Sequence, residues 1–194
     1  MPDLMFDEAL HIFTLDGRRI ASVTQILKHF IPRWNCDLFY LERGTAVHKA
    51  TELYDKGTLD MNSVDPQIEG YLQAWIKFRE DYRFIPSWIE RQAYHPVFLY
   101  AGIIDRIGDC KEGNCILDIK SSGTQSKFDL LQLAGYSCLV SAPKTLNIYL
   151  QEDGRYKVKI YTPKELGEAK NVFLSMVTIW NFLINKGIIS WNNT

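Results

Sequence analysis

The chain has 194 residues, of which 46% are hydrophobic and 23% are charged, and its formal net charge is −1. A chain of this length can bury a large core as one domain, over residues 1–194, without disulfides or structural metal ions. Ten tyrosines, ten phenylalanines and five tryptophans exclude an intrinsically disordered chain. The small net charge gives no overall basic field for nucleic acid, although a local basic groove would not show in the sum.

The sequence also bears on the compartment. It contains no apolar segment long enough to cross a membrane, and its first residues lack the basic and then apolar layout of a signal peptide. We therefore expect a cytoplasmic protein with no membrane partner. The four cysteines show no CxxC spacing, and in a reducing compartment we expect free thiols at Cys36, Cys110, Cys115 and Cys138.

Two structural signals come first in the chain. Residues 10–21 alternate weakly around Asp16-Gly17, a pair that is favoured in hairpin turns. Ser22 and Gln25 then fit a capping box, so a short helix should begin after Ser22 and stop at Pro32.

The spacing of the apolar residues predicts a helix over residues 38–55. Gly44 and His48 lie four residues apart and therefore share one face of this helix. Because a glycine inside a helix costs about 1 kcal/mol relative to alanine, Gly44 indicates a close approach by another backbone or a ligand. For His48 alone, the alternative is a partly buried, hydrogen-bonded histidine.

A longer helix should begin at Asp65-Pro66, with an N-cap followed by proline at the first helical position. Its apolar and aromatic face is typical of a buried helix, and we expect it to end at Pro86. Residues 88–94 then predict a strand with Glu90 in its middle. An isolated glutamate in such a position usually faces solvent.

Residues 100–120 organise the chain, because they predict a β-hairpin that carries charges within its strands. Asp105 lies inside the first strand. Asp118 and Lys120 end the second strand, where residues two apart share a face. Carboxylates that paired strands deliver to one face can hold a hard divalent cation, and a lysine beside it can stabilise developing charge or orient a water. In the alternative, the two carboxylates are ordinary strand-edge groups paired with Arg106 and Lys120.

The remaining sequence predicts two helices and a hairpin. Residues 130–140 are apolar on most sides, so this helix should be buried against a sheet, with Ser126 as its N-cap. Residues 146–161 predict a second hairpin. A capping box at Thr162 begins a last helix, which Gly187 should end. The order of helices and strands predicts an α/β fold with a central mixed sheet flanked by helices.

The polar residues follow one another in a definite order. They read Gly44-x-x-x-His48, Glu90, Gly102-x-x-Asp105, Asp118-Ile119-Lys120 and Gln132-x-x-x-Tyr136. In this order, and in its local sequence, the chain resembles the PD-(D/E)XK nuclease superfamily, in its RecB-like and lambda-exonuclease-like branch. The closest local matches are Arg43-Gly44-Thr45-Ala46-Val47-His48, Asp118-Ile119-Lys120-Ser121-Ser122 and Gln132-Leu133-Ala134-Gly135-Tyr136. The resemblance covers about residues 22–140 and begins with a segment, residues 22–27, similar to that of phage-type members.

This resemblance implies a restriction-endonuclease-like core with a metal site. Asp105 and Asp118 would be the metal-binding carboxylates, and the backbone carbonyl of Ile119 and the imidazole of His48 would be further ligands. Mg²⁺ suits such oxygen donors, and an imidazole shifts the preference towards Mn²⁺.

The resemblance also implies the roles of the other polar residues. Lys120 would position and activate the attacking water or stabilise the charge that develops on the phosphate. Glu90 would assist the metal site directly or through a water. Gln132, Tyr136 and Ser121 would contact the substrate.

The implied function is a metal-dependent deoxyribonuclease, in particular an exonuclease, that acts on DNA in recombination, repair or phage DNA processing. DNA would be its partner, and a recombination or single-strand-annealing protein is a candidate second partner. The alternative is a catalytically inactive nucleic-acid-binding module of the same fold, which the complete set of Asp105, Asp118 and Lys120 disfavours. A nuclease with an iron–sulfur cluster is disfavoured because only Cys138 follows Tyr136.

Overall fold

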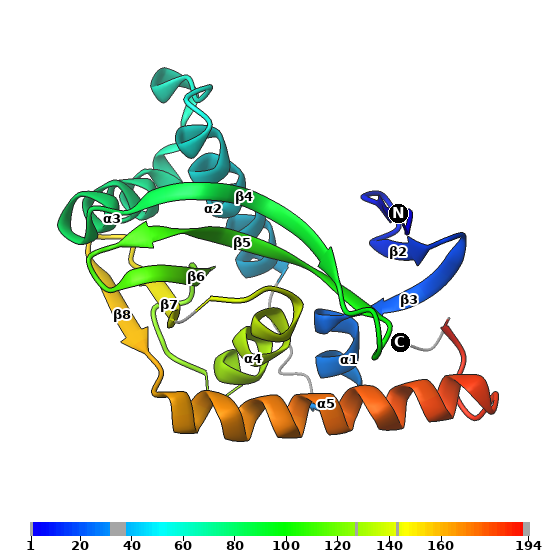
Figure 1. The fold of residues 1–194 in the computed structure, drawn as a ribbon. Helices are drawn as coiled ribbons and strands as arrows, with labels where there is room; N and C mark the ends of the chain where they lie inside the picture. The colour runs from blue at the N-terminus through cyan, green and yellow to red at the C-terminus, as the bar shows by residue number, and fades with distance from the viewer. Residues whose placement is uncertain (1, 32–37, 127, 143, 192–194) are drawn as a thin grey trace.

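The structure, a computed structural model, describes residues 2–31, 38–126, 128–142 and 144–191. The predicted helix stop at Pro32 and the thiol of Cys36 lie outside these ranges. In the described part of the chain, five α-helices flank a mixed sheet of eight strands (Figure 1). This confirms the predicted α/β fold with a central mixed sheet.

The strands are β1 (Leu4–Asp7), β2 (Ile12–Leu15), β3 (Arg18–Ser22), β4 (Ile85–Tyr94), β5 (Tyr100–Cys110), β6 (Gly113–Lys120), β7 (Lys144–Leu150) and β8 (Tyr156–Ile160). The α-helices are α1 (Val23–Phe30), α2 (Leu38–Asp55), α3 (Pro66–Tyr82), α4 (Asp129–Leu139) and α5 (Pro163–Asn185). A 3-10 helix, Met61–Ser63, lies between α2 and α3.

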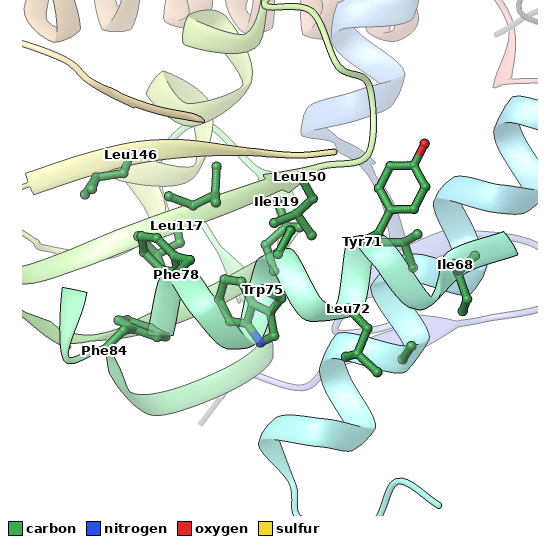
Figure 2. Packing of buried hydrophobic residues seen from close by; sticks show 14 of the residues in the cluster. Ile68, Tyr71, Leu72, Trp75, Phe78, Phe84, Leu117, Ile119, Leu146 and Leu150 are labelled. Atoms are coloured by element: carbon green, nitrogen blue, oxygen red, sulfur yellow. The ribbon is translucent and has the colours of Figure 1, made fainter. Parts of the chain in front are cut away.

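The helices form a layer on each face of the sheet. Helices α2 and α3 cover one face, and α1, α4 and α5 lie on the other, with the long α5 outermost (Figure 1). Figure 2 shows how Trp75 and Phe78 of α3 pack on the strand residues Leu117 and Leu146. Among the helices that the structure describes, none combines the length and the apolar character needed to cross a membrane.

Strand β5 has different neighbours along its two edges. The register pairs Ala101 with both β3 and β4, and Arg106 with both β4 and β6. Strands β3 and β6 therefore share the edge opposite β4, β3 at the start of β5 and β6 at its end. In the described residues no strand pairs with the segment between them on this edge, residues 102–105. We call this opening the fork.

Beyond the fork, β6 continues beside β7 alone, in parallel register. Leu117 and Ile119 of β6 belong to the core under α2 and α3, whereas Ile116 belongs to the core under α1, α4 and α5. Because side chains alternate along a strand, Asp118 and Lys120 share the face of Ile116 and point towards α4. The prediction that these two residues share a face is confirmed.

Local signals account for most of the element boundaries. Ser22 and Thr162 both form the predicted capping boxes, at the starts of α1 and α5. Asp65 caps α3 by accepting the N–H of Gln67, as its position before proline predicted. The predicted hairpin turn at Asp16-Gly17 joins β2 to β3.

Two predicted boundaries were wrong, and strand β1 was not predicted. Helix α3 ends before Pro86, because Arg83 takes a left-handed φ of 50° and stops the helix, and Pro86 lies inside β4. Helix α4 begins at Asp129 and has no side-chain cap. The hydroxyl of Ser126 instead accepts the N–H of Phe128 in the turn before the helix.

A fully buried ion pair ties the sheet to the layer of α2 and α3. The guanidinium of Arg106 donates from Nε to Asp55 at the end of α2, and neither side chain is exposed to solvent. Asp55 also accepts hydrogen bonds from Trp75 and Arg79 of α3. Removing one partner of such a pair is costly, because it leaves the other charge buried and incompletely neutralised.

We predict that Arg106→Met lowers the free energy of unfolding by about 3–5 kcal/mol, measured by urea denaturation. The control is Arg155→Met, which removes an exposed arginine paired with Asp153 in the turn between β7 and β8. That variant should leave stability almost unchanged, since exposed ion pairs contribute little. Equal effects of the two substitutions would contradict this account of the core.

Candidate metal centre

Asp105 occupies the fork. Strand β6 parts from β5 after Leu117, and the next unpaired peptide N–H, that of Ile119, donates to Oδ2 of Asp105 at 2.7 Å. Asp105 is 7% exposed. Its carboxylate therefore replaces the missing strand neighbour and remains in contact with the open side of the fork.

Three potential metal ligands from three elements meet here. His48 of α2, Glu90 of β4 and Asp105 of β5 each offer a ligand atom, and these atoms lie within 4.8 Å of one another. Nδ1 of His48 is 3.7 Å from Oδ2 of Asp105. Ligand atoms on opposite sides of a hard cation are about 4.2 Å apart, twice a bond length of about 2.1 Å. The cluster could thus hold a metal ion after a small side-chain movement.

Glu90 reaches this cluster from an unusual backbone conformation. The neighbouring pairs of the β4–β5 register place Glu90 opposite Asp105, and its φ of 49° is uncommon for a residue other than glycine. Nη1 of Arg106 donates to Oε1 of Glu90 at 2.8 Å. The buried arginine therefore holds both Asp55 and Glu90 and connects the core of the protein to the cluster.

A chain of polar contacts lies beside the cluster. The ammonium of Lys120 is 2.8 Å from Oδ2 of Asp118 and donates to Oε1 of Gln132 at 2.6 Å. Nε2 of Gln132 then donates to the hydroxyl of Tyr136 at 3.0 Å. The hydrogen bond from Lys120 to Gln132 therefore joins the predicted pair on β6, Asp118 and Lys120, to the predicted pair on α4, Gln132 and Tyr136.

Asp118 is fixed by the neighbouring strand. The side-chain amide of Asn147 on β7 donates to Oδ2 of Asp118 at 2.6 Å, and the hydroxyl of Tyr161 donates to Oδ1 of Asn147 at 2.8 Å. Both Asp118 and Asn147 are essentially inaccessible to solvent. Sequence reasoning missed Asn147, whose signal was a polar amide within an apolar strand.

Burial and mutual repulsion shift the acidic groups. Desolvation, together with the charge of Asp105, raises the pKa of Glu90 to about 7. Desolvation raises the pKa of Asp118 to about 6, with the charge of Asp105 adding to the effect and Lys120 opposing it. For Lys120, burial lowers the pKa, but the adjacent carboxylate of Asp118 outweighs it and the net pKa is raised. Lys120 is therefore a cation at neutral pH.

The hydroxyl of Tyr136 also keeps its proton. Burial, with the nearby charges of Asp105 and Asp118, raises its pKa well above the ordinary value for tyrosine. Tyr136 can therefore act as a hydrogen-bond donor at the fork. It approaches β5 because Gly102 has no side chain: a Cβ there would lie 2.9 Å from Cε1 of Tyr136, closer than packed atoms allow.

Gly44 and Ser121 meet on the other side of the site. A Cβ at Gly44 would lie 3.5 Å from Oγ of Ser121, an ordinary contact, so alanine would fit. The carbonyl of Ser121 accepts from Nη2 of Arg43 at 3.4 Å. The loop after β6 thus contacts the helix that carries His48. The contact is at an ordinary distance and is made by a side chain, so the close approach by another backbone or a ligand stays a prediction.

The structure brings the site residues predicted from the resemblance together at the fork. The cluster contains Glu90, although an isolated glutamate in the middle of a strand usually faces solvent. Asp118 adjoins the cluster rather than being one of its three members, so its role as a ligand stays a prediction, as does that of the Ile119 carbonyl. The alternative, in which the two strand carboxylates pair with Arg106 and Lys120, holds in part, because Asp118 does pair with Lys120. Arg106, however, pairs with Asp55 and Glu90.

Comparison with known proteins assigns no family to the chain. No protein-family model matches it, and no curated protein matches it at a significant level. The solved structures similar to it include the crystal structure of SSO0001, which is 15% identical. That alignment covers 81% of this chain and 84% of the other, with a TM-score of 0.36.

We predict that the metal-free protein loses stability as the pH rises from about 5 to about 8. The folded-state pKa values of Glu90 and Asp118, about 7 and about 6, lie above the ordinary values that an unfolded chain would show. The folded protein therefore binds more protons over this range, and ionising these groups costs stability. Urea midpoints measured with a chelator present should fall with pH.

Glu90→Gln should flatten this dependence, whereas the control Glu112→Gln, at a half-buried position in the turn between β5 and β6, should not. An identical pH dependence in both variants would show that Glu90 is not responsible.

A further prediction concerns metal affinity. His48→Ala should weaken Mn²⁺ binding by at least about tenfold. Affinity in the wild type should fall as the pH drops below about 7, because protons compete with the metal for the carboxylate of Glu90, whose pKa is raised to about 7. Gly44→Leu should also weaken binding by displacing α2 from Ser121, whereas Gly44→Ala should not. Calorimetric titration at several pH values tests these expectations. Unchanged affinity in His48→Ala would remove His48 from the site.

Proposed function

We propose that this protein is a divalent-metal-dependent deoxyribonuclease of the PD-(D/E)XK type, with a restriction-endonuclease-like core, that acts on DNA in the cytoplasm. The observation that carries the proposal is the convergence at one fork of the two residue groups. The chain of Asp118, Lys120, Gln132 and Tyr136 lies near the cluster of His48, Glu90 and Asp105, because Tyr136 lines the same cavity as Glu90 and Asp105 and the charge of Asp105 acts on Asp118. These are the residues that the sequence resemblance named.

The chemistry of phosphodiester cleavage explains why such a site would be useful. A phosphodiester is an anion, and it repels a hydroxide nucleophile. A divalent cation held by His48, Glu90 and Asp105 would supply positive charge at the scissile phosphate and favour ionisation of a water. One imidazole and two carboxylates suit Mg²⁺, and Mn²⁺ more because it accepts nitrogen ligands readily.

The chain's own residues then have separate tasks. The ammonium of Lys120 is held between Asp118 and Gln132, which fixes its position beside the carboxylates. There it can orient the attacking water and stabilise the charge that develops on the phosphate oxygens. Gln132 and the protonated hydroxyl of Tyr136 can donate hydrogen bonds to the same phosphate or to a water.

We predict that Lys120→Ala and Asp118→Asn each lower DNA hydrolysis by at least about a hundredfold, because each removes a group that acts on the phosphate or holds the lysine. Lys157→Ala and Asp109→Asn, at exposed strand positions, are the matched controls. Linear and covalently closed circular DNA should be tested with Mg²⁺ and with Mn²⁺. Digestion of the linear DNA without digestion of the closed circular DNA would identify an exonuclease.

Thermal unfolding of each variant would separate loss of activity from loss of fold. Wild-type hydrolysis by either site variant would overturn the assignment of the site. Binding of DNA without hydrolysis by the wild type, under every metal tested, would favour the inactive binding module instead.

A further inference from the structure

A cavity of about 490 Å³ opens directly from the metal cluster. Glu90 and Asp105 line one end of it, with Tyr136 beside them. Its other walls come from the N-terminal strands β1 and β2 and from α1. The cavity thus extends from the proposed site of hydrolysis to β1, β2 and α1, which carry none of the site residues.

The end of the cavity away from the carboxylates is aromatic. Phe6 of β1 packs on Phe13 of β2, with ring centroids 4.6 Å apart, and the ring of His11 meets Phe6 edge to face at 5.7 Å. Phe13 is buried, whereas Phe6 is half-buried and His11 is exposed. Phe6 and His11 therefore offer the accessible flat surfaces at this end.

The helix side of the cavity is polar. Thr24 and Lys28 lie one helical turn apart on α1, both exposed and both lining the cavity. The cavity therefore offers aromatic faces and hydrogen-bonding groups at one end and carboxylates at the other. In the absence of a cation, an anionic group would be repelled from the carboxylate end, so a bound phosphate belongs there only together with the metal ion.

We propose that this cavity receives one unpaired base of the DNA strand that is cut, stacked on the ring of Phe6 or of His11 with its edge against the other ring, while the adjacent phosphate lies at the cluster. The proposal rests on the proposed function and specifies its substrate. The volume lies within the range of pockets for small molecules, roughly 300–1,000 Å³, and it is too small for a base pair with its two backbones. The strand must therefore be single-stranded, or opened at its end, where it is cut.

Stacking explains what such a pocket would and would not select. Every base has a flat π-face, so binding by aromatic stacking tolerates any sequence. The pocket is therefore expected to recognise the presence of a base and not its identity. Removing the base from one nucleotide should weaken binding by about tenfold, the lower part of the range known for base–aromatic stacking.

The test measures binding of short single-stranded oligonucleotides by fluorescence anisotropy, in the Lys120→Ala background with Mn²⁺, where the strand should remain intact. A series of strands carries one abasic nucleotide at successive positions. One position should be about tenfold more sensitive than the others. In His11→Asn and in Phe6→Leu that sensitivity should disappear, because the stacking surface has been removed.

Each variant is chosen to preserve the fold. His11 has a φ of 51°, and asparagine tolerates this left-handed conformation. Leucine at Phe6 keeps apolar contact with Phe13. The control is His29→Asn, which replaces another exposed histidine whose ring contacts Trp180 and does not line the cavity. This control should keep the abasic sensitivity of the parent.

The outcomes separate the pocket from the nuclease. Uniform sensitivity along the strand, or a sensitive position that survives both pocket substitutions, overturns the pocket, whether or not the wild type hydrolyses DNA. A pocket-dependent position in a protein that hydrolyses no DNA supports the pocket and overturns the nuclease. Absence of any binding to single strands overturns the proposed occupant.

Discussion

The site depends on one interruption of regular strand pairing. Where β6 leaves β5, a peptide N–H would remain unpaired in the interior, which is costly for a folded protein. Asp105 supplies the acceptor, and so its carboxylate stabilises the fork from within. The same group is one member of the cluster with His48 and Glu90. Structural and chemical roles therefore fall on a single side chain.

The acidic groups at the fork are stabilised from two sides. Arg106 neutralises Glu90 from the core under α2 and α3, and Lys120 neutralises Asp118 from the side of α4. The neutralisation is incomplete, because the pKa of Glu90 remains near 7 and that of Asp118 near 6. A divalent cation would relieve the remaining repulsion, which couples the proposed activity to the stability of the fold.

Helix α4 can contribute to the fork only because it lies unusually close to its neighbours. A side chain at Gly102 would meet Tyr136, and one at Gly135 would lie 2.9 Å from Phe173 of α5. The long α5 presses α4 towards the sheet from outside (Figure 1). The C-terminal helix, which has no motif of its own, thus positions Tyr136 through packing.

The sequence by itself determined the caps of α1, α3 and α5, the hairpins and the order of the polar motifs, because these depend on residues a few positions apart. It also paired Asp118 with Lys120 on one face, since strand alternation is local. The resemblance implied that Glu90 assists the site, but only the tertiary structure decided that it lies within ligand distance of His48 and Asp105 and that Arg106 holds it. Those contacts join residues distant in sequence, and they arise when β4 pairs with β5 and the helices α2 and α3 pack on the sheet, burying charges that must then find partners.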